Sequence, residues 1–90
     1  MKWIEQIRVR SSSDALETSL PSLRITLDEI EAANQGAETF SMQHALYEGD
    51  LAVVIVWSTG TPRKTREALL IAQQLERVGS VDHAVWHPTK

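Results

Sequence analysis

The sequence predicts an α+β domain whose elements follow the order βαββαβ, and three features indicate it. Four stretches show the period of two that is typical of strands, and the third of them is apolar on both faces. Two stretches between them place apolar residues at helical spacing. A short glycine-containing turn separates the second strand from the third, as in a hairpin. The whole chain, residues 1–90, is expected to form a single domain with one modest core.

The first strand is predicted at residues 2–10. One of its faces carries Trp3, Glu5, Ile7 and Val9, and the other carries Ile4, Gln6, Arg8 and Arg10. The serines at positions 11–13 end this strand.

The first helix is predicted to have Asp14 as its cap, with Glu17 completing a capping box. Its apolar stripe advances by steps of four and three through Leu16, Leu20, Leu23, Leu27 and Ile30. Pro21 lacks an N–H but does not change the phase of the stripe, so we expect a kink or two helices that meet at residues 19–21. Gly36 can adopt a positive φ and provides the exit.

Two further strands are predicted at residues 39–47 and 51–57. The turn between them, at residues 48–50, contains Gly49, which we expect to supply a positive φ. The strand at 51–57 is apolar on both faces, which is typical of a central strand that is covered twice.

The second helix is predicted to begin with Thr61 as its cap and Pro62 in the first helical position. Its apolar stripe comprises Ala68, Ile71, Ala72, Leu75 and Val78. Gly79 is expected to end this helix, and a last strand is predicted at residues 81–87.

This order is that of the ferredoxin-like fold. Right-handed crossovers give a four-stranded antiparallel sheet of order 4-1-3-2, with both helices on one face. The strand at 51–57 is then central, but the helices cover only one of its two apolar faces. We therefore expect a homodimer in which a second copy covers the other face, sheet against sheet.

Composition limits the classes of function. A formal charge of −3 at pH 7 disfavours a nucleic-acid partner. The absence of cysteine excludes disulfides, thiolate metal sites and a cysteine nucleophile. The longest apolar run, at 51–57, is far short of the ~18 to 20 residues of a membrane-spanning helix, and residues 1–10 lack the apolar stretch of a signal peptide. We therefore expect a cytoplasmic protein with no membrane partner.

The spacing of two histidines raises the question of a metal site. His83 and His87 are four positions apart, which on a helix would suit zinc. On a strand that rises about 3.3 Å per residue, however, they lie roughly 13 Å apart. Each zinc ligand must approach the ion within about 2.1 Å, so no metal site is predicted.

One predicted sheet face combines titratable and apolar side chains. The candidate catalytic residues on it are Glu5, His44 and His83, because titratable groups in an apolar, concave setting are what a small-molecule site needs. The candidate ligand-binding residues on the same face are Trp3, Phe40, Met42 and Trp57. His44 and His83 fall on opposite edge strands, so they could meet only across a dimer. Each histidine also fits a hydrogen-bonded residue of the core or its rim.

The opposite predicted face carries two basic residues, Arg8 and Arg10. They could hold a carboxylate or a phosphate. We expect them instead to pair with acidic groups of the chain itself, such as Asp82 or Glu48.

The element order, the segment DLAVVIVW at 50–57 and the closing VDHAVWHP at 81–88 resemble the dimeric α+β barrel superfamily. This group includes antibiotic-biosynthesis-monooxygenase-like proteins, muconolactone isomerases and small stress-responsive barrel proteins. The resemblance spans nearly the whole chain. It implies two sheets paired around a partly hollow barrel, and an aromatic or haem-like ligand between sheet and helices. The Asn-dependent chemistry of some members is not expected, since the only asparagine, Asn34, falls in a predicted loop.

Two functions remain open at this point. The first is a cofactor-free enzyme or binding protein of the monooxygenase or isomerase kind. A small aromatic ligand would lie against Trp57, with His44 or His83 as general base. The second is a non-catalytic homodimeric module whose free sheet face serves self-association alone. Neither function requires a metal or a cofactor.

Overall fold

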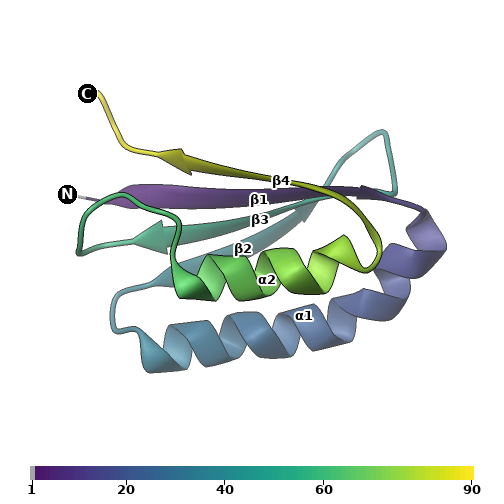
Figure 1. Cartoon of the computed structure of the whole chain (residues 1–90), viewed down its shortest axis with the longest axis horizontal. Helices are drawn as coiled ribbons and strands as arrows, with labels where there is room; N and C mark the ends of the chain where they lie inside the picture. Colours follow the sequence, from purple (N-terminus) through teal and green to yellow (C-terminus); the bar gives the residue numbers. More distant parts are fainter. Residues whose placement is uncertain (1) are drawn as a thin grey trace.

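The structure, a computed structural model, describes residues 2–90 apart from the side chain of Ser13. Its elements are β1 (Trp3–Ser11), α1 (Ser13–Ala33), β2 (Glu38–Gln43), β3 (Asp50–Trp57), α2 (Arg66–Glu76) and β4 (Gly79–Trp86). The strands form one antiparallel sheet in the order β2-β3-β1-β4. Both helices lie on the same side of this sheet (Figure 1). The predicted ferredoxin-like fold is thereby confirmed.

The core lies between the sheet and the two helices. Alternate residues of β1 and β3 face the helices, and the register places Trp3 opposite Trp57. Ile7 sits between Val53 on one side and His83 on the other. The predicted helical stripes are confirmed by burial of Leu16, Leu23, Leu27 and Ile30 in α1 and of Ala68, Ile71, Ala72 and Leu75 in α2.

Both helix caps differ from the predicted ones. The cap of α1 is Ser12, whose hydroxyl accepts the N–H of Ala15, because the helix begins one residue before Asp14. The cap of α2 is Thr65, four residues after the predicted Thr61. The Thr65 hydroxyl accepts the N–H of Ala68 at 3.1 Å. The start of α2 is fixed there by contacts of Thr65 with β1.

Pro21 lies inside a single helix, so the prediction of two separate helices is wrong. Figure 1 shows α1 bending in its N-terminal part, as a kink would. Pro21 has no N–H to donate to the carbonyl of Glu17, which loosens the helix at this turn. Two hydroxyls in the preceding turn, those of Thr18 and Ser19, bond back to main-chain carbonyls.

Strand β2 presents its faces opposite to the prediction. Phe40 pairs with Val54 and Met42 with Ala52, so both point to the side of the sheet away from the helices. The predicted common face with Trp57 is therefore wrong for these two residues. The connection to β3 is a six-residue loop at 44–49 and not a tight turn at 48–50, and the register sets Gln43 opposite Leu51, so that even-numbered residues of β2 lie opposite even-numbered residues of β3. A one-residue change of register exchanges the two faces of a strand.

Glycine is required in this loop for a reason that differs from the predicted one. Gly49 has no positive φ. A Cβ atom at this position would instead lie 1.7 Å from the main-chain oxygen of Ser11, where β1 passes close to the loop. At Gly36 the predicted positive φ is present, at 85°. The last strand begins earlier than predicted. Gly79 therefore lies in β4, opposite Ser11 of β1, and does not end α2.

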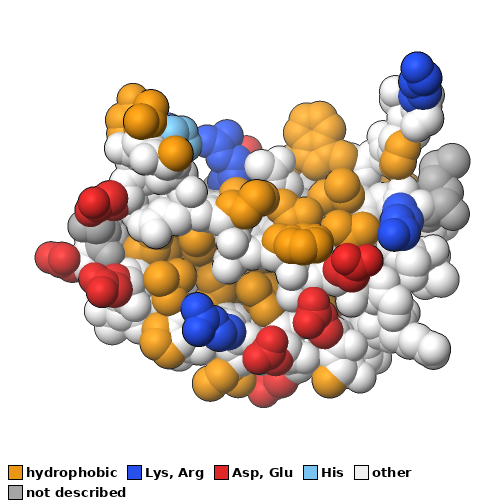
Figure 2. Space-filling view, turned by 180° about the vertical axis from the view of Figure 1, so that it is seen from behind, with side chains coloured by type: hydrophobic (Ala, Val, Ile, Leu, Met, Phe, Trp, Pro, Cys, Tyr) orange, Lys and Arg blue, Asp and Glu red, His pale blue; other side chains and the backbone are white. Residues whose placement is uncertain are grey.

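The sheet face away from the helices, called the open face below, is largely apolar. Phe40, Met42 and Trp86 are exposed on it by 47%, 52% and 57%. Half-buried residues of the two central strands lie between them, namely Ile4, Val54 and Val56. Figure 2 views the molecule from behind, with the sheet above the helices, and shows hydrophobic side chains gathered across the middle of that view. Within the described part of the chain, neither helix combines the length and the hydropathy needed to cross a membrane.

Candidate functional site

A buried carboxylate lies at the centre of the helix-covered face. Glu5, in the middle of β1, has 0% of its surface exposed. Its Oε1 accepts the backbone N–H of Thr65 at 2.9 Å, and its Oε2 accepts the indole Nε1–H of Trp57 at 2.8 Å. The Thr65 hydroxyl donates to Oε2 and His83 Nε2 lies 3.0 Å from Oε1. A buried carboxylate is costly unless it is hydrogen-bonded, and both oxygens of Glu5 take part in hydrogen bonds.

The donors to Glu5 come from three other elements. Trp57 ends β3, Thr65 caps α2 and His83 lies in β4. The N-terminus of α2 also carries a partial positive charge that favours a carboxylate beside it. Glu5 therefore joins the sheet to α2, and it also places a carboxylate in the interior of the protein.

Two stacked tryptophans adjoin this carboxylate. The rings of Trp3 and Trp57 lie 5.8 Å apart between centroids, with 27° between their planes. The Nε1–H of Trp3 donates to the carbonyl oxygen of Thr59 at 2.9 Å, and the guanidinium of Arg63 lies 6.0 Å from the centre of the Trp3 ring. These contacts fasten the segment 58–65, between β3 and α2, against the tryptophans.

The contact with Glu5 assigns the proton on His83. When Glu5 is ionised it can only accept, and in that state the Nε2 of His83 carries the hydrogen and donates it. The other ring nitrogen, Nδ1, then has a free lone pair and no hydrogen-bond partner among residues 2–90. His83 can accept a proton there, and the imidazolium that forms is stabilised by Glu5 in contact with it. The geometry is that of an orienting acid and a base.

The structure brings together four of the seven predicted site residues. Glu5, His83, Trp57 and Trp3 meet on the helix-covered face, and their predicted common face is confirmed. Phe40 and Met42 lie on the open face instead, for the reason of register given above.

His44 is also separate from this cluster, which corrects the prediction that it shares a face with Glu5. It follows β2 in an exposed loop. Its Nδ1 accepts the backbone N–H groups of Leu46 at 3.0 Å and Tyr47 at 3.3 Å, and its ring lies 4.8 Å from that of Tyr47. These local bonds hold the ring within its own loop.

The contribution of Thr65 was not foreseen from the sequence, in which Thr61 is the predicted cap of α2. Thr65 is 3% exposed and makes two of the hydrogen bonds to Glu5. A signal was present in the spacing, since Thr65 stands three residues before Ala68, the first residue of the apolar stripe. The partner 60 positions away could not be read from that spacing.

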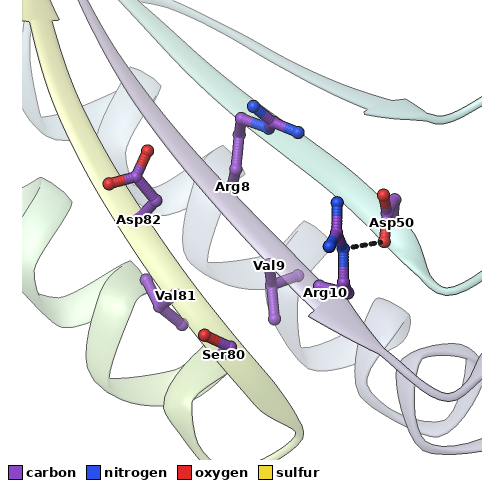
Figure 3. Close-up of a pocket in the computed structure, with 7 residues that line it drawn as sticks. All are labelled: Arg8, Val9, Arg10, Asp50, Ser80, Val81 and Asp82. Atoms are coloured by element: carbon purple, nitrogen blue, oxygen red, sulfur yellow. Dashed lines mark ion pairs between the residues drawn. The ribbon is translucent and has the colours of Figure 1, made fainter.

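The marked hollows on the surface lie elsewhere. Glu5 and His83 line none of the five that stand out on residues 2–90. One, of about 210 Å³, opens between the ends of β1 and β4 and is bordered by Arg8, Arg10 and Asp82 (Figure 3). Arg10 Nε lies 3.4 Å from Asp50 Oδ1, so its partner is Asp50 and not the expected Asp82 or Glu48.

Neither a set of metal ligands nor the asparagine lies beside the Glu5 cluster in the described residues. Across residues 2–90, no group of three or more His, Asp or Glu side chains is placed to share a metal ion. His87 lies beyond the end of β4 and contacts the carbonyl of Pro88 at 3.3 Å. Asn34 caps the C-terminus of α1, where its amide donates to the carbonyl of Ile30 at 2.9 Å.

Comparison with known proteins places the fold. No protein-family model matches the chain, and no curated protein matches it significantly. Among solved structures, Rv0793 from Mycobacterium tuberculosis is similar with a TM-score of 0.72 and 15% identity, over 100% of this chain and 97% of the other. A proposed antibiotic biosynthesis monooxygenase from Nitrosomonas europaea gives 0.72 and 11%, over 98% and 90%.

A third similar structure is SnoaB, a cofactor-independent oxygenase from Streptomyces nogalater. Its TM-score is 0.58 at 10% identity, over 99% of this chain and 92% of the other. Identities this low establish the fold alone, which is the ferredoxin-like fold that these structures share with this chain. The chemistry must be argued from the residues of this chain.

Proposed function

We propose that the protein is a homodimeric α+β barrel protein of the cofactor-independent monooxygenase or isomerase kind, which binds a small aromatic ligand. The observation that carries this proposal is the buried hydrogen bond between Glu5 and His83 beside two stacked tryptophans. The fold supports it, since SnoaB, a cofactor-independent oxygenase, has the same fold.

The proposed reaction uses the residues in distinct roles. Trp57 and Trp3 stack against the aromatic ligand. The Nδ1 of His83 removes a proton from a phenol or enol group of this ligand, and Glu5 stabilises the imidazolium that forms. The resulting electron-rich anion reacts directly with dioxygen in a monooxygenase, or takes a proton back at another atom in an isomerase. Neither route requires a cofactor of the protein.

Access to the tryptophans requires the segment 59–64, which precedes the buried Thr65, to move. Residues 59–64 are exposed, and Gly60 adopts a φ of 86° that allows this stretch an irregular path. The segment is held over Trp3 by one hydrogen bond, from the indole to Thr59, and by the contact of Arg63 with the ring. These are few contacts to break, which makes this segment the entrance in the proposed function.

The homodimer is proposed from the open face. Its exposed aromatic and apolar residues on three strands form the kind of patch that marks an interface. A second copy of the same face is complementary to it by symmetry, and pairing sheet against sheet covers both. This proposal agrees with the expectation of a homodimer, which was drawn from the apolar residues on both faces of β3.

The experiment for activity incubates the protein with a panel of phenols, quinols and enols in the presence and absence of dioxygen. We expect turnover of at least one oxidisable compound, followed by oxygen consumption and product mass. His83→Gln should lower this rate about 100-fold or more, as for loss of a general base. His87→Gln, an exposed histidine outside the cluster, is the matched control and should leave it unchanged. Equal rates in the two variants would contradict the role of His83.

A non-catalytic homodimeric module is the second candidate, and one observation favours it. Both oxygens of Glu5 are occupied by hydrogen bonds, and no marked hollow adjoins this residue. In this case the cluster only stabilises the fold. Quenching of tryptophan fluorescence separates the two: titration with the same aromatic panel should quench the wild type but leave a pure interaction module unaffected.

A further inference from the structure

A small hollow lies on the other side of the sheet, apart from the proposed active site. It has a volume of about 130 Å³ and lies over β3, where the 44–49 loop returns to the sheet. Its lining includes Arg8, Met42, His44, Asp50 and Ala52. We propose that this hollow is a binding site for a small carboxylate with an apolar body about the size of a benzene ring.

The floor and one wall of the hollow are apolar. Met42 and Ala52 are register partners on neighbouring strands, and both face away from the helices. A cavity of about 150 Å³ lined by apolar side chains is large enough for benzene. The hollow, at about 130 Å³ with one open side, therefore suits a single ring or a branched aliphatic group.

Arg8 supplies the charge for this site. Its register neighbour on β4 is Asp82, but Figure 3 shows its guanidinium directed over β3, away from that carboxylate. Among the described residues, no acidic group lies within ion-pair distance of Arg8. The guanidinium is thus available to bind a carboxylate through two parallel hydrogen bonds. Asp50 also lines the hollow, but its charge is offset by Arg10 at 3.4 Å.

His44 supplies a second donor. Its Nδ1 accepts two backbone N–H groups, so the neutral ring carries its hydrogen on Nε2. Arg8 and His44 both line the hollow and both carry donors, and a carboxylate can accept from both. The local hydrogen bonds of His44 Nδ1, which hold this ring apart from the Glu5 cluster, thereby leave Nε2–H as its donor for this site.

This site is independent of the proposed reaction. It lies on the far side of the sheet from Glu5 and His83. The apolar row of Ile4, Val56 and Trp86 lies at the opposite end of the strands from Arg10 and Asp50. Met42 belongs both to the apolar patch of the open face and to the hollow. An interface centred on Ile4, Val56 and Trp86 would leave the hollow at its rim, where polar contacts are expected.

The test is a titration of the full-length ¹⁵N-labelled protein with benzoate, followed by NMR. We expect shifts of the Arg8 Nε–H signal and of the His44 ring, and at least tenfold weaker binding of the neutral analogue benzamide. Arg8→Gln should weaken benzoate binding at least tenfold. Arg66→Gln makes the same change of charge at an exposed position on α2 and should weaken it less than twofold.

A second variant tests the hollow without changing the charge. Ala52→Val narrows the apolar wall with a residue that strands accept, and it should weaken benzoate binding at least tenfold while the protein stays folded by NMR. Equal affinity for benzoate and benzamide, unchanged affinity in Arg8→Gln or Ala52→Val, or shifts confined to Trp3 and Trp57 would each overturn the proposal.

Discussion

At the scale of single residues, Glu5 is the residue whose replacement we expect to have the most effects. Its replacement by alanine removes the acceptor of four donors, which are the Trp57 indole, the backbone N–H and the hydroxyl of Thr65, and the His83 ring. Each unsatisfied buried donor costs about 1 to 3 kcal/mol. We expect Glu5→Ala to lower the free energy of unfolding in urea by at least about 3 kcal/mol. Glu29→Ala, on the exposed side of α1, is the control and should change it by no more than about 0.5 kcal/mol; similar losses in both would contradict the role of Glu5.

Two variants of Thr65 separate the effect of its hydroxyl on stability from the effect of its side-chain volume. Thr65→Val keeps the shape but removes the hydroxyl that caps α2 and bonds to Glu5. We expect a loss of about 1 to 2 kcal/mol in the free energy of unfolding, as for other lost caps. Thr65→Ser retains the hydroxyl and should lose less than half as much. A serine variant as unstable as the valine variant would show that the methyl group, and not the hydrogen bonds, accounts for the effect.

At the scale of elements, the register that follows the 44–49 loop decides which face β2 presents. Alternation within β1, β3 and β4 is visible in the sequence, and so is the meeting of Glu5 with Trp57 and His83. The face of each residue in β2 depends on the register with β3, which the alternation within one strand does not contain. Phe40 and Met42 therefore changed faces although the strand itself was expected. The cap at Thr65 escaped prediction because its partner lies in β1.

The path of this loop depends on Gly49. A Cβ atom there would lie 1.7 Å from a main-chain oxygen of Ser11, and neither backbone can move without disturbing β1 or β3. We expect Gly49→Ala to destabilise the protein by at least about 2 kcal/mol in thermal or urea unfolding. Gly60→Ala, at an exposed position with positive φ, should cost only about 1 kcal/mol. The reverse order would show that the loop can move away from β1.

At the scale of the whole molecule, the sheet is covered by helices on one side and bare on the other. The fold class and strand order follow from the sequence, because the periods of two and 3.6 and the crossover rule leave few topologies. The doubly apolar β3 also follows from it. The close packing around Glu5 does not follow from the sequence, since it results from side chains of four elements that pack together.

The pairing of two open faces is tested most directly by the mass of the protein in solution. Sedimentation equilibrium at micromolar concentration should give twice the chain mass of 10.1 kDa, and Val54→Lys, which places a charge in the middle of the open face, should return it to the chain mass. A wild-type mass of 10.1 kDa would mean that the apolar open face stays in water, and it would contradict the proposed barrel.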